Sequence, residues 1–156
     1  SIGAFWAVGV AVEVLFMFWS ARVMSRISAE TMFALAFAGA VARWGMMSAA
    51  PGITGLVVAQ SLHALTFGAF HIAAVTLIHR TAPPSLRATG QTLYSSLAYG
   101  VGSGVSSLFN GALYARWGAS ALFGVSAVAA AAGLLLAARH LAVTVRSGRT
   151  NPTSDE

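Results

Sequence analysis

One apolar run in this chain reads ITGLVVAQSLHALTFGAFHIAAVTLI and covers residues 53–78. It contains no Arg, Lys, Asp or Glu. At a rise of about 1.5 Å per residue, a helix of this length exceeds the roughly 30 Å of hydrocarbon in a bilayer. The run therefore predicts a transmembrane helix.

The rest of the chain has the same character. Of its 156 residues, 57% are hydrophobic and 8% are charged, against about a quarter charged in soluble domains. Nothing alternates with period two over about ten residues, which disfavours an outer-membrane barrel. We expect an all-α polytopic bundle over residues 1–140 with about five transmembrane helices, followed by a disordered cytoplasmic tail over 141–156. The expected spans are 2–20, 32–49, 53–78, 90–113 and 120–138.

All nine basic residues are Arg, and the eight that lie outside the spans alternate between the two ends of the spans. Seven lie in the connections after the first and third spans and after the last, whereas Arg116 alone lies on the other side. The positive-inside rule puts the Arg-rich side and the C-terminus in the cytoplasm, and the start of the chain outside. No basic stripe lies on a soluble face, so we expect no nucleic-acid partner. A first residue that is Ser, outside the membrane, predicts a fragment that lacks an upstream helical half.

The ionisable residues inside the spans are candidates for function, because charges in hydrocarbon are costly and usually face a cavity. They are Glu13, Arg43, His63 and His71. Glu13 and His63 each lie about 15 Å from the outer end of their span, and Arg43 about 12 Å from the end of its own. Three helices thus contribute to one layer near the bilayer centre.

The third span has a polar face. Gln60, His63, Phe67 and His71 fall within one stripe at 100° per residue. His63, His71 and His79 are eight residues apart, too far to share one ion. Cys is absent, and we expect no metal or cofactor.

Two interpretations of the polar layer remain open. In one, Glu13 and Arg43 form a structural ion pair, and His63 is a core histidine whose ring nitrogens are hydrogen-bonded. The chain is then a non-transporting membrane subunit or assembly factor. In the other, the titratable layer couples transport to protons. An enzyme is not expected, because the spans hold no Asp pair, no Ser–His arrangement and no metal ligands at helical spacing.

The sequence resembles the C-terminal half of a major facilitator superfamily transporter, from the eighth to the twelfth helix. Within that superfamily it is most similar to the branch of phenylpropionate permeases, nucleoside–proton symporters and lactose permease. The most specific string is the one expected for the tenth helix. The matching strings are VAVEVLFMF (10–18), VARWGMM (41–47), QSLHALTFGAFHIAAVTLIHR (60–80), PPSLRATGQTLYSS (83–96) and GVGSGVSSLFNG (100–111).

The resemblance implies two six-helix halves, a central cavity and alternating access. Glu13 would match the branch's eighth-helix carboxylate, Arg43 its ninth-helix arginine and His63 its tenth-helix histidine. Lactose permease has an acid one turn after that histidine, where this chain has Thr66. Sugar specificity of that type is therefore not expected, and the proton-carrying role shifts towards Glu13.

The resemblance thus predicts a proton symporter of the bacterial inner membrane for a small organic solute, such as an aromatic carboxylate or a nucleoside. Glu13 would bind the proton, and Arg43 would pair with Glu13 or with an anionic substrate. Gln60 and His63 would orient the solute, with Phe67 and His71 on the same face. The expected partners are the lipid bilayer, the substrate, protons and the missing N-terminal half.

Overall fold

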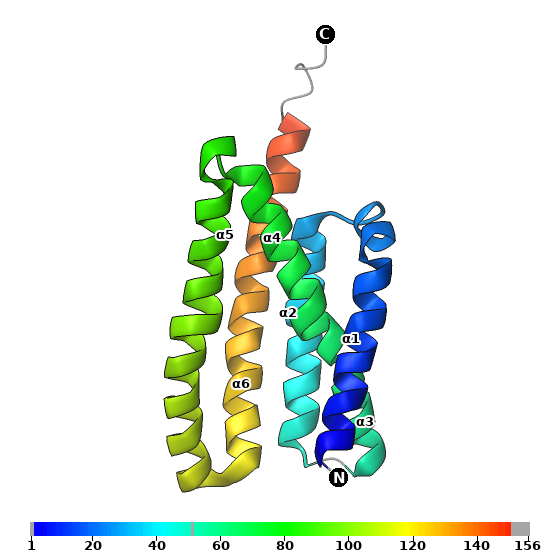
Figure 1. Ribbon diagram of the computed structural model, residues 1–156, viewed down its shortest axis with the longest axis vertical. Helices are drawn as coiled ribbons and strands as arrows, with labels where there is room; N and C mark the ends of the chain where they lie inside the picture. The colour runs from blue at the N-terminus through cyan, green and yellow to red at the C-terminus, as the bar shows by residue number, and fades with distance from the viewer. Residues whose placement is uncertain (1, 51, 151–156) are drawn as a thin grey trace.

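The computed structural model describes residues 2–50 and 52–150. The described chain is a bundle of long helices, as expected for an all-α membrane protein (Figure 1). Two short segments within it are π-helical, η1 and η3, and one is a 3₁₀ turn, η2. The elements are α1 (Ile2–Met24), α2 (Ala29–Ser48), α3 (Ile53–Ser61), η1 (Ala64–Ala69), α4 (Phe70–Thr81), η2 (Pro84–Leu86), α5 (Arg87–Ser95), η3 (Ser96–Val101) and α6 (Gly102–Thr150).

Helix α6 is a hairpin. Gly118 has φ of +76°, a left-handed conformation that suits glycine, and the chain turns back there (Figure 1). We call residues 87–117 the outer arm and residues 119–150 the inner arm. Three helical stretches are long and apolar enough to cross a membrane, and the last of them contains both arms. They are Ala7–Met24, Ile53–Thr81 and Pro84–Val143.

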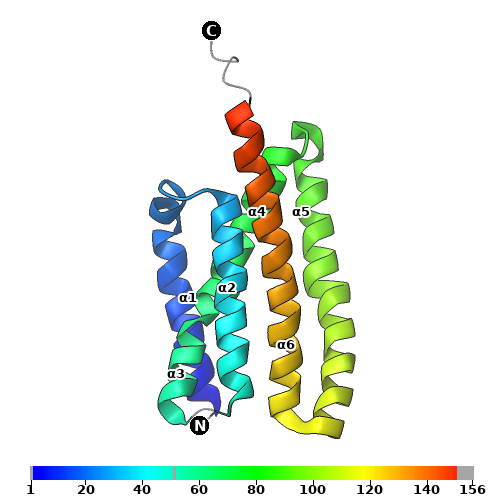
Figure 2. The same cartoon turned by 180° about the vertical axis from the view of Figure 1, so that it is seen from behind.

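Helix α2 lies at the centre, between α1 and the inner arm in both views (Figures 1 and 2). It begins where the Ser28 hydroxyl accepts a hydrogen bond from the Thr31 amide at 3.1 Å, which satisfies one of the free N–H groups of the first turn. Met32 and Ala36 pack against Ala69 and Ala73 of the third span to form the buried core.

Small residues let the helices around α2 approach closely. A Cβ at Gly133 of the inner arm would overlap the ring of Phe37 on α2. A Cβ at Gly39 would lie 3.1 Å from the Cβ of Leu65 in η1. The Phe37 ring of α2 therefore packs against the backbone of the inner arm, and the Leu65 side chain packs against the backbone of α2.

The outer arm is packed much less. Residues 95–109 are all exposed, including Leu97, Val105 and Leu108. A cavity, described below, lies between the outer arm, the inner arm and α2. In this chain the outer arm therefore presents an apolar surface to its surroundings.

The helices differ from the sequence-based expectation in two ways. The inner arm stays helical to Thr150, whereas a tail was expected from residue 141, and no proline interrupts the chain before Pro152; residues 151–156 lie outside the described part. The third and fourth spans also contain π-helical turns that hydrophobic periodicity did not predict.

Candidate functional site

The structure pairs Glu13 of α1 with His63, which follows α3. His63 Nε2 lies 3.3 Å from Glu13 Oε2, and Glu13 is only 9% exposed. Two glycines allow this approach. A Cβ at Gly9 would lie 3.4 Å from the Cβ of His63, and a Cβ at Gly68 would lie 3.3 Å from the Cγ of Glu13. The close backbone contact thus brings a carboxylate and an imidazole together in the apolar interior.

Arg43 occupies the neighbouring position on α2 and is 8% exposed. Its Nη1 donates to Thr66 Oγ1 at 2.9 Å, and its Nη2 donates to Gln60 Oε1 at 3.3 Å. The guanidinium also lies 4.4 Å from the centre of the Trp44 ring, a cation–π geometry. Arg43 is therefore a fixed positive charge held by three neutral side chains.

Thr66 connects the two parts of this polar layer. Its hydroxyl accepts from Arg43 and donates to the backbone carbonyl of His63 at 3.2 Å. Thr66 lies within η1, and π-helical turns are frequent at functional sites. The threonine that stands where lactose permease has an acid is thus the hydrogen-bond partner of Arg43.

The structure brings Glu13, Arg43, Gln60 and His63 together but does not pair Glu13 with Arg43. Among the described residues, Glu13 makes its ion pair with His63 and no carboxylate lies within 4.0 Å of the Arg43 guanidinium. The sequence gives the position of each residue along its helix. The rotation of each helix about its axis decides which side chain that residue contacts. The widened turn of η1 changes that rotation along the third span.

Phe67 and His71 lie further along the third span, and the rings of both lie near Tyr99 of η3. The rings of His63 and Phe67 are stacked, with centroids 5.6 Å apart and planes 14° apart. Phe67 then contacts Tyr99 of η3 at 5.7 Å between ring centroids. A row of rings thus leads from the Glu13–His63 pair towards the outer arm.

The sequence reasoning missed Tyr94 and Tyr99. His71 Nδ1 lies 3.1 Å from the Tyr99 hydroxyl and 3.4 Å from the Tyr94 hydroxyl. The only available signal was two phenols within an apolar span, since a buried Tyr hydroxyl usually finds a polar partner. We call His71, Tyr94 and Tyr99 the histidine–tyrosine cluster.

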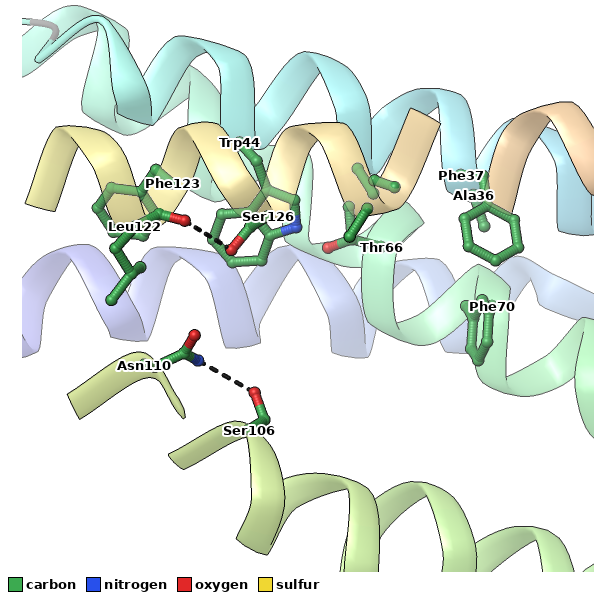
Figure 3. Close-up of a pocket in the computed structure, with 13 residues that line it drawn as sticks. Ala36, Phe37, Trp44, Thr66, Phe70, Ser106, Asn110, Leu122, Phe123 and Ser126 are labelled. Carbon is green, nitrogen blue, oxygen red and sulfur yellow. Dashed lines mark hydrogen bonds between the residues drawn. The ribbon is translucent and has the colours of Figure 1, made fainter. Parts of the chain in front are cut away.

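A cavity of about 550 Å³ separates the outer arm from α2 and the inner arm (Figure 3). Asn110 and Ser106 of the outer arm, joined by a 3.0 Å hydrogen bond, line one side. Trp44 and Thr66 line the opposite side, so the cavity reaches the partners of Arg43. Among residues 2–50 and 52–150, no group of three His, Asp or Glu side chains is placed to hold a metal ion.

Comparison with known proteins identifies the family. The sequence profile of the MFS_1-like family matches residues 1–125. A protein named "Probable 3-phenylpropionic acid transporter", from Escherichia coli (strain K12), is 33% identical over 137 residues, which cover 87% of this chain and 35% of that protein. This chain thus spans about a third of the length of that relative. No solved structure matches the chain.

These findings agree with the resemblance drawn from Glu13, Arg43 and the string at 60–80. They also agree with an all-α fold whose helices are long and apolar enough to cross a membrane. The chain belongs to the MFS_1-like family of the major facilitator superfamily and is a multi-pass membrane protein.

Proposed function

We propose that this chain is the C-terminal part of a secondary transporter that moves a small organic anion together with a proton. The observation that carries the proposal is the buried pair of Glu13 and His63 beside the fixed charge of Arg43. An aromatic carboxylate is the preferred substrate class, because the sequence relative is named for 3-phenylpropionic acid. A nucleoside is the alternative class.

The charges of the layer support coupling between a proton and an anion. With Glu13 ionised, Arg43 protonated and His63 neutral, the layer has no net charge. One added proton, on Glu13 or on His63, leaves a net charge of +1. Because an uncompensated charge in hydrocarbon is costly, the proton and an anionic solute bind more favourably together than either binds alone. This is the thermodynamic requirement for symport.

Each candidate residue has a role in this scheme. Glu13 carries the proton with His63 as its partner, and Arg43 supplies the fixed charge that attracts an anion. Gln60 holds Arg43 in place. Phe67 and His71 face the solute, and His63 is coupled to the solute because its ring stacks on that of Phe67. The remaining cavity wall would come from an N-terminal helical part of the same transporter.

The charge distribution supports an orientation. Seven Arg lie on the side that we assign to the cytoplasm, together with the C-terminus. At that end, Arg80 Nη1 lies 3.6 Å from Glu30 Oε1 and joins the end of α4 to the start of α2. We place the protein in a bacterial inner membrane, where a proton gradient is available to drive uptake.

The test uses the full-length transporter that carries this chain. Glu13→Gln mimics the protonated carboxyl group and keeps its shape, so we expect it to abolish uphill accumulation of labelled 3-phenylpropionate. Exchange of internal for external substrate should persist, because exchange needs no net release of a proton. Glu30→Gln is the matched control, since Glu30 lies in the first turn of α2, outside the polar layer. Accumulation by Glu13→Gln equal to that of the parent would contradict the proposal and favour a structural Glu13 in a non-transporting subunit.

A further inference from the structure

The histidine–tyrosine cluster joins the third span to the outer arm through three polar atoms. The Tyr94 and Tyr99 hydroxyl oxygens lie 3.3 Å apart, and each lies within 3.4 Å of His71 Nδ1. His71 comes from α4, Tyr94 from α5 and Tyr99 from η3. Each of the three atoms therefore has the other two within hydrogen-bonding distance.

In one of the two neutral tautomers of His71, one tyrosine hydroxyl hydrogen has no acceptor within the cluster. When Nδ1 has no proton, Tyr94 donates to Tyr99 and Tyr99 donates to Nδ1, so both hydroxyl hydrogens are used. When Nδ1 carries the proton, it donates to Tyr99 and Tyr99 donates to Tyr94. The Tyr94 O–H then has no acceptor within the cluster, and it is available to a ligand.

No described carboxylate serves as that acceptor. Glu13 is engaged by His63, and Glu30 by Arg80. Arg43 is buried and held by Gln60 and Thr66, so it acts on a solute through its charge rather than by contact. The histidine–tyrosine cluster is therefore better placed than Arg43 to donate hydrogen bonds to an anion.

An aromatic surface lies beside these donors. Phe67 is 41% exposed and Tyr99 is 39% exposed, and their rings are in contact. Both residues lie in π-helical turns, η1 and η3, which are common where a helix serves a functional site. A solute with a ring next to a carboxylate matches a surface with rings next to a free O–H donor.

We propose that the histidine–tyrosine cluster binds the carboxylate of the substrate while Phe67 stacks on its aromatic ring, an assignment that rests on the proposed transport of an aromatic carboxylate. Tyr94 and Tyr99 are the specificity-determining residues. They distinguish an ionised acid from a neutral analogue of the same shape. Because Phe67 also stacks on His63, an occupied site touches the Glu13–His63 pair.

The test measures how well 3-phenylpropionate and its neutral amide compete with labelled 3-phenylpropionate for uptake by the full-length transporter. The parent protein should prefer the acid. Tyr94→Phe keeps the ring but removes the hydroxyl that is free to donate to the carboxylate, and a lost hydrogen bond to a charged group corresponds to about a tenfold or greater loss of affinity. The KM for the acid should rise by about that factor while competition by the amide stays unchanged. Tyr99→Phe keeps the ring against Phe67 and removes the phenol that accepts from His71 and donates to Tyr94, so its effect on the KM should be smaller.

Tyr114→Phe is the matched control, because Tyr114 is an exposed phenol of the same arm outside the cluster. The amount of each variant in the membrane is measured in parallel. If both cluster variants keep the parent's preference for the acid, this assignment is wrong and the proposed function stands. If the parent takes up no aromatic carboxylate, the proposed function and this assignment fail together.

Discussion

Helix α2 and the outer arm are both long helical elements of one chain, but they differ in burial. Helix α2 buries Met32, Ala36 and Arg43 among others, whereas residues 95–109 of the outer arm are all exposed. Among the described residues of the outer arm, only Leu113 is buried. A helix that is packed between neighbours on two sides can hold a charged residue in a fixed position. A helix that is open on most sides is free to present side chains to a solute or to another part of the protein.

This difference also separates the two kinds of polar residue. The Glu13–His63 pair and Arg43 lie in the packed region around α2. Glu13 and Arg43 are buried, and the His63 side chain is 21% exposed. Tyr94 and Tyr99 lie on the outer arm, and Tyr99 is exposed. We propose that the Glu13–His63 pair carries the proton and that the tyrosines of the outer arm recognise the solute.

The largest effect that would test this comparison is expected at Arg43. Arg43→Ala removes two hydrogen bonds from a charged donor, each worth about 1.5–3 kcal/mol, and leaves Thr66 and Gln60 without that partner. Both accumulation and exchange should fall at least tenfold, because the layer loses its fixed positive charge. Arg116→Ala, at the exposed end of the outer arm, should change either rate little. Equal losses in the two variants would mean that the layer around α2 has no special role.

A second expected effect concerns packing between α2 and the inner arm. Gly133→Ala places a methyl group against the Phe37 ring, and overpacking of this kind costs about 1–3 kcal/mol. The midpoint of thermal unfolding in detergent should fall. Gly104→Ala on the outer arm meets no atom within 4 Å and should leave the midpoint unchanged or raise it, since Ala favours helix over Gly. A fall of the same size at Gly104 would show that the outer arm is packed in solution.

The smallest expected effect is at the N-terminal end of α2. A hydrogen bond from its own backbone amide lowers the pKa of Glu30 from its ordinary value of 4.5; burial opposes this, and the Ser28 hydroxyl, the Arg80 guanidinium and His140 add to the lowering. A carboxyl group whose pKa is lower in the folded than in the unfolded state stabilises the fold at pH values above its unfolded-state pKa. This stabilisation is lost as the pH falls through the folded-state pKa.

Glu30→Gln should therefore lower the unfolding midpoint slightly at pH 7 and make no difference well below pH 4. We expect less than about 1 kcal/mol, because Arg80 is largely exposed to solvent. Unfolding curves of both proteins across that pH range give the measurement. A difference that grows as the pH falls would contradict the assignment of Glu30 as the stabilised ionised form.

The sequence could predict much of the fold because the apolar runs and Arg-bearing connections are local features. The runs at 2–20, 32–49 and 53–78 correspond to observed helical segments. The turn at Gly118 also fell between two expected spans. These features depend on composition along the chain rather than on contacts between helices.

The pairing within the site could not be predicted in the same way. Glu13 contacts His63 and not Arg43 because Gly9 and Gly68 allow α1 and the third span to approach closely. Tyr94 and Tyr99 meet His71 only once the outer arm has folded back beside α4. Each π-helical turn also rotates the side chains that follow it relative to an ideal helix. Such contacts depend on helix rotation and tertiary packing, which hydrophobic periodicity does not specify.

The most direct test of proton coupling is the pH of a lightly buffered suspension of energy-depleted cells that express the full-length transporter. Addition of 3-phenylpropionate to the parent protein should make the medium more alkaline, because protons enter together with the anion. The Glu13→Gln variant should exchange the same substrate without this pH change. Uptake by the parent protein with no alkalinisation, or alkalinisation of equal size in Glu13→Gln, would contradict the claim that Glu13 carries the coupled proton.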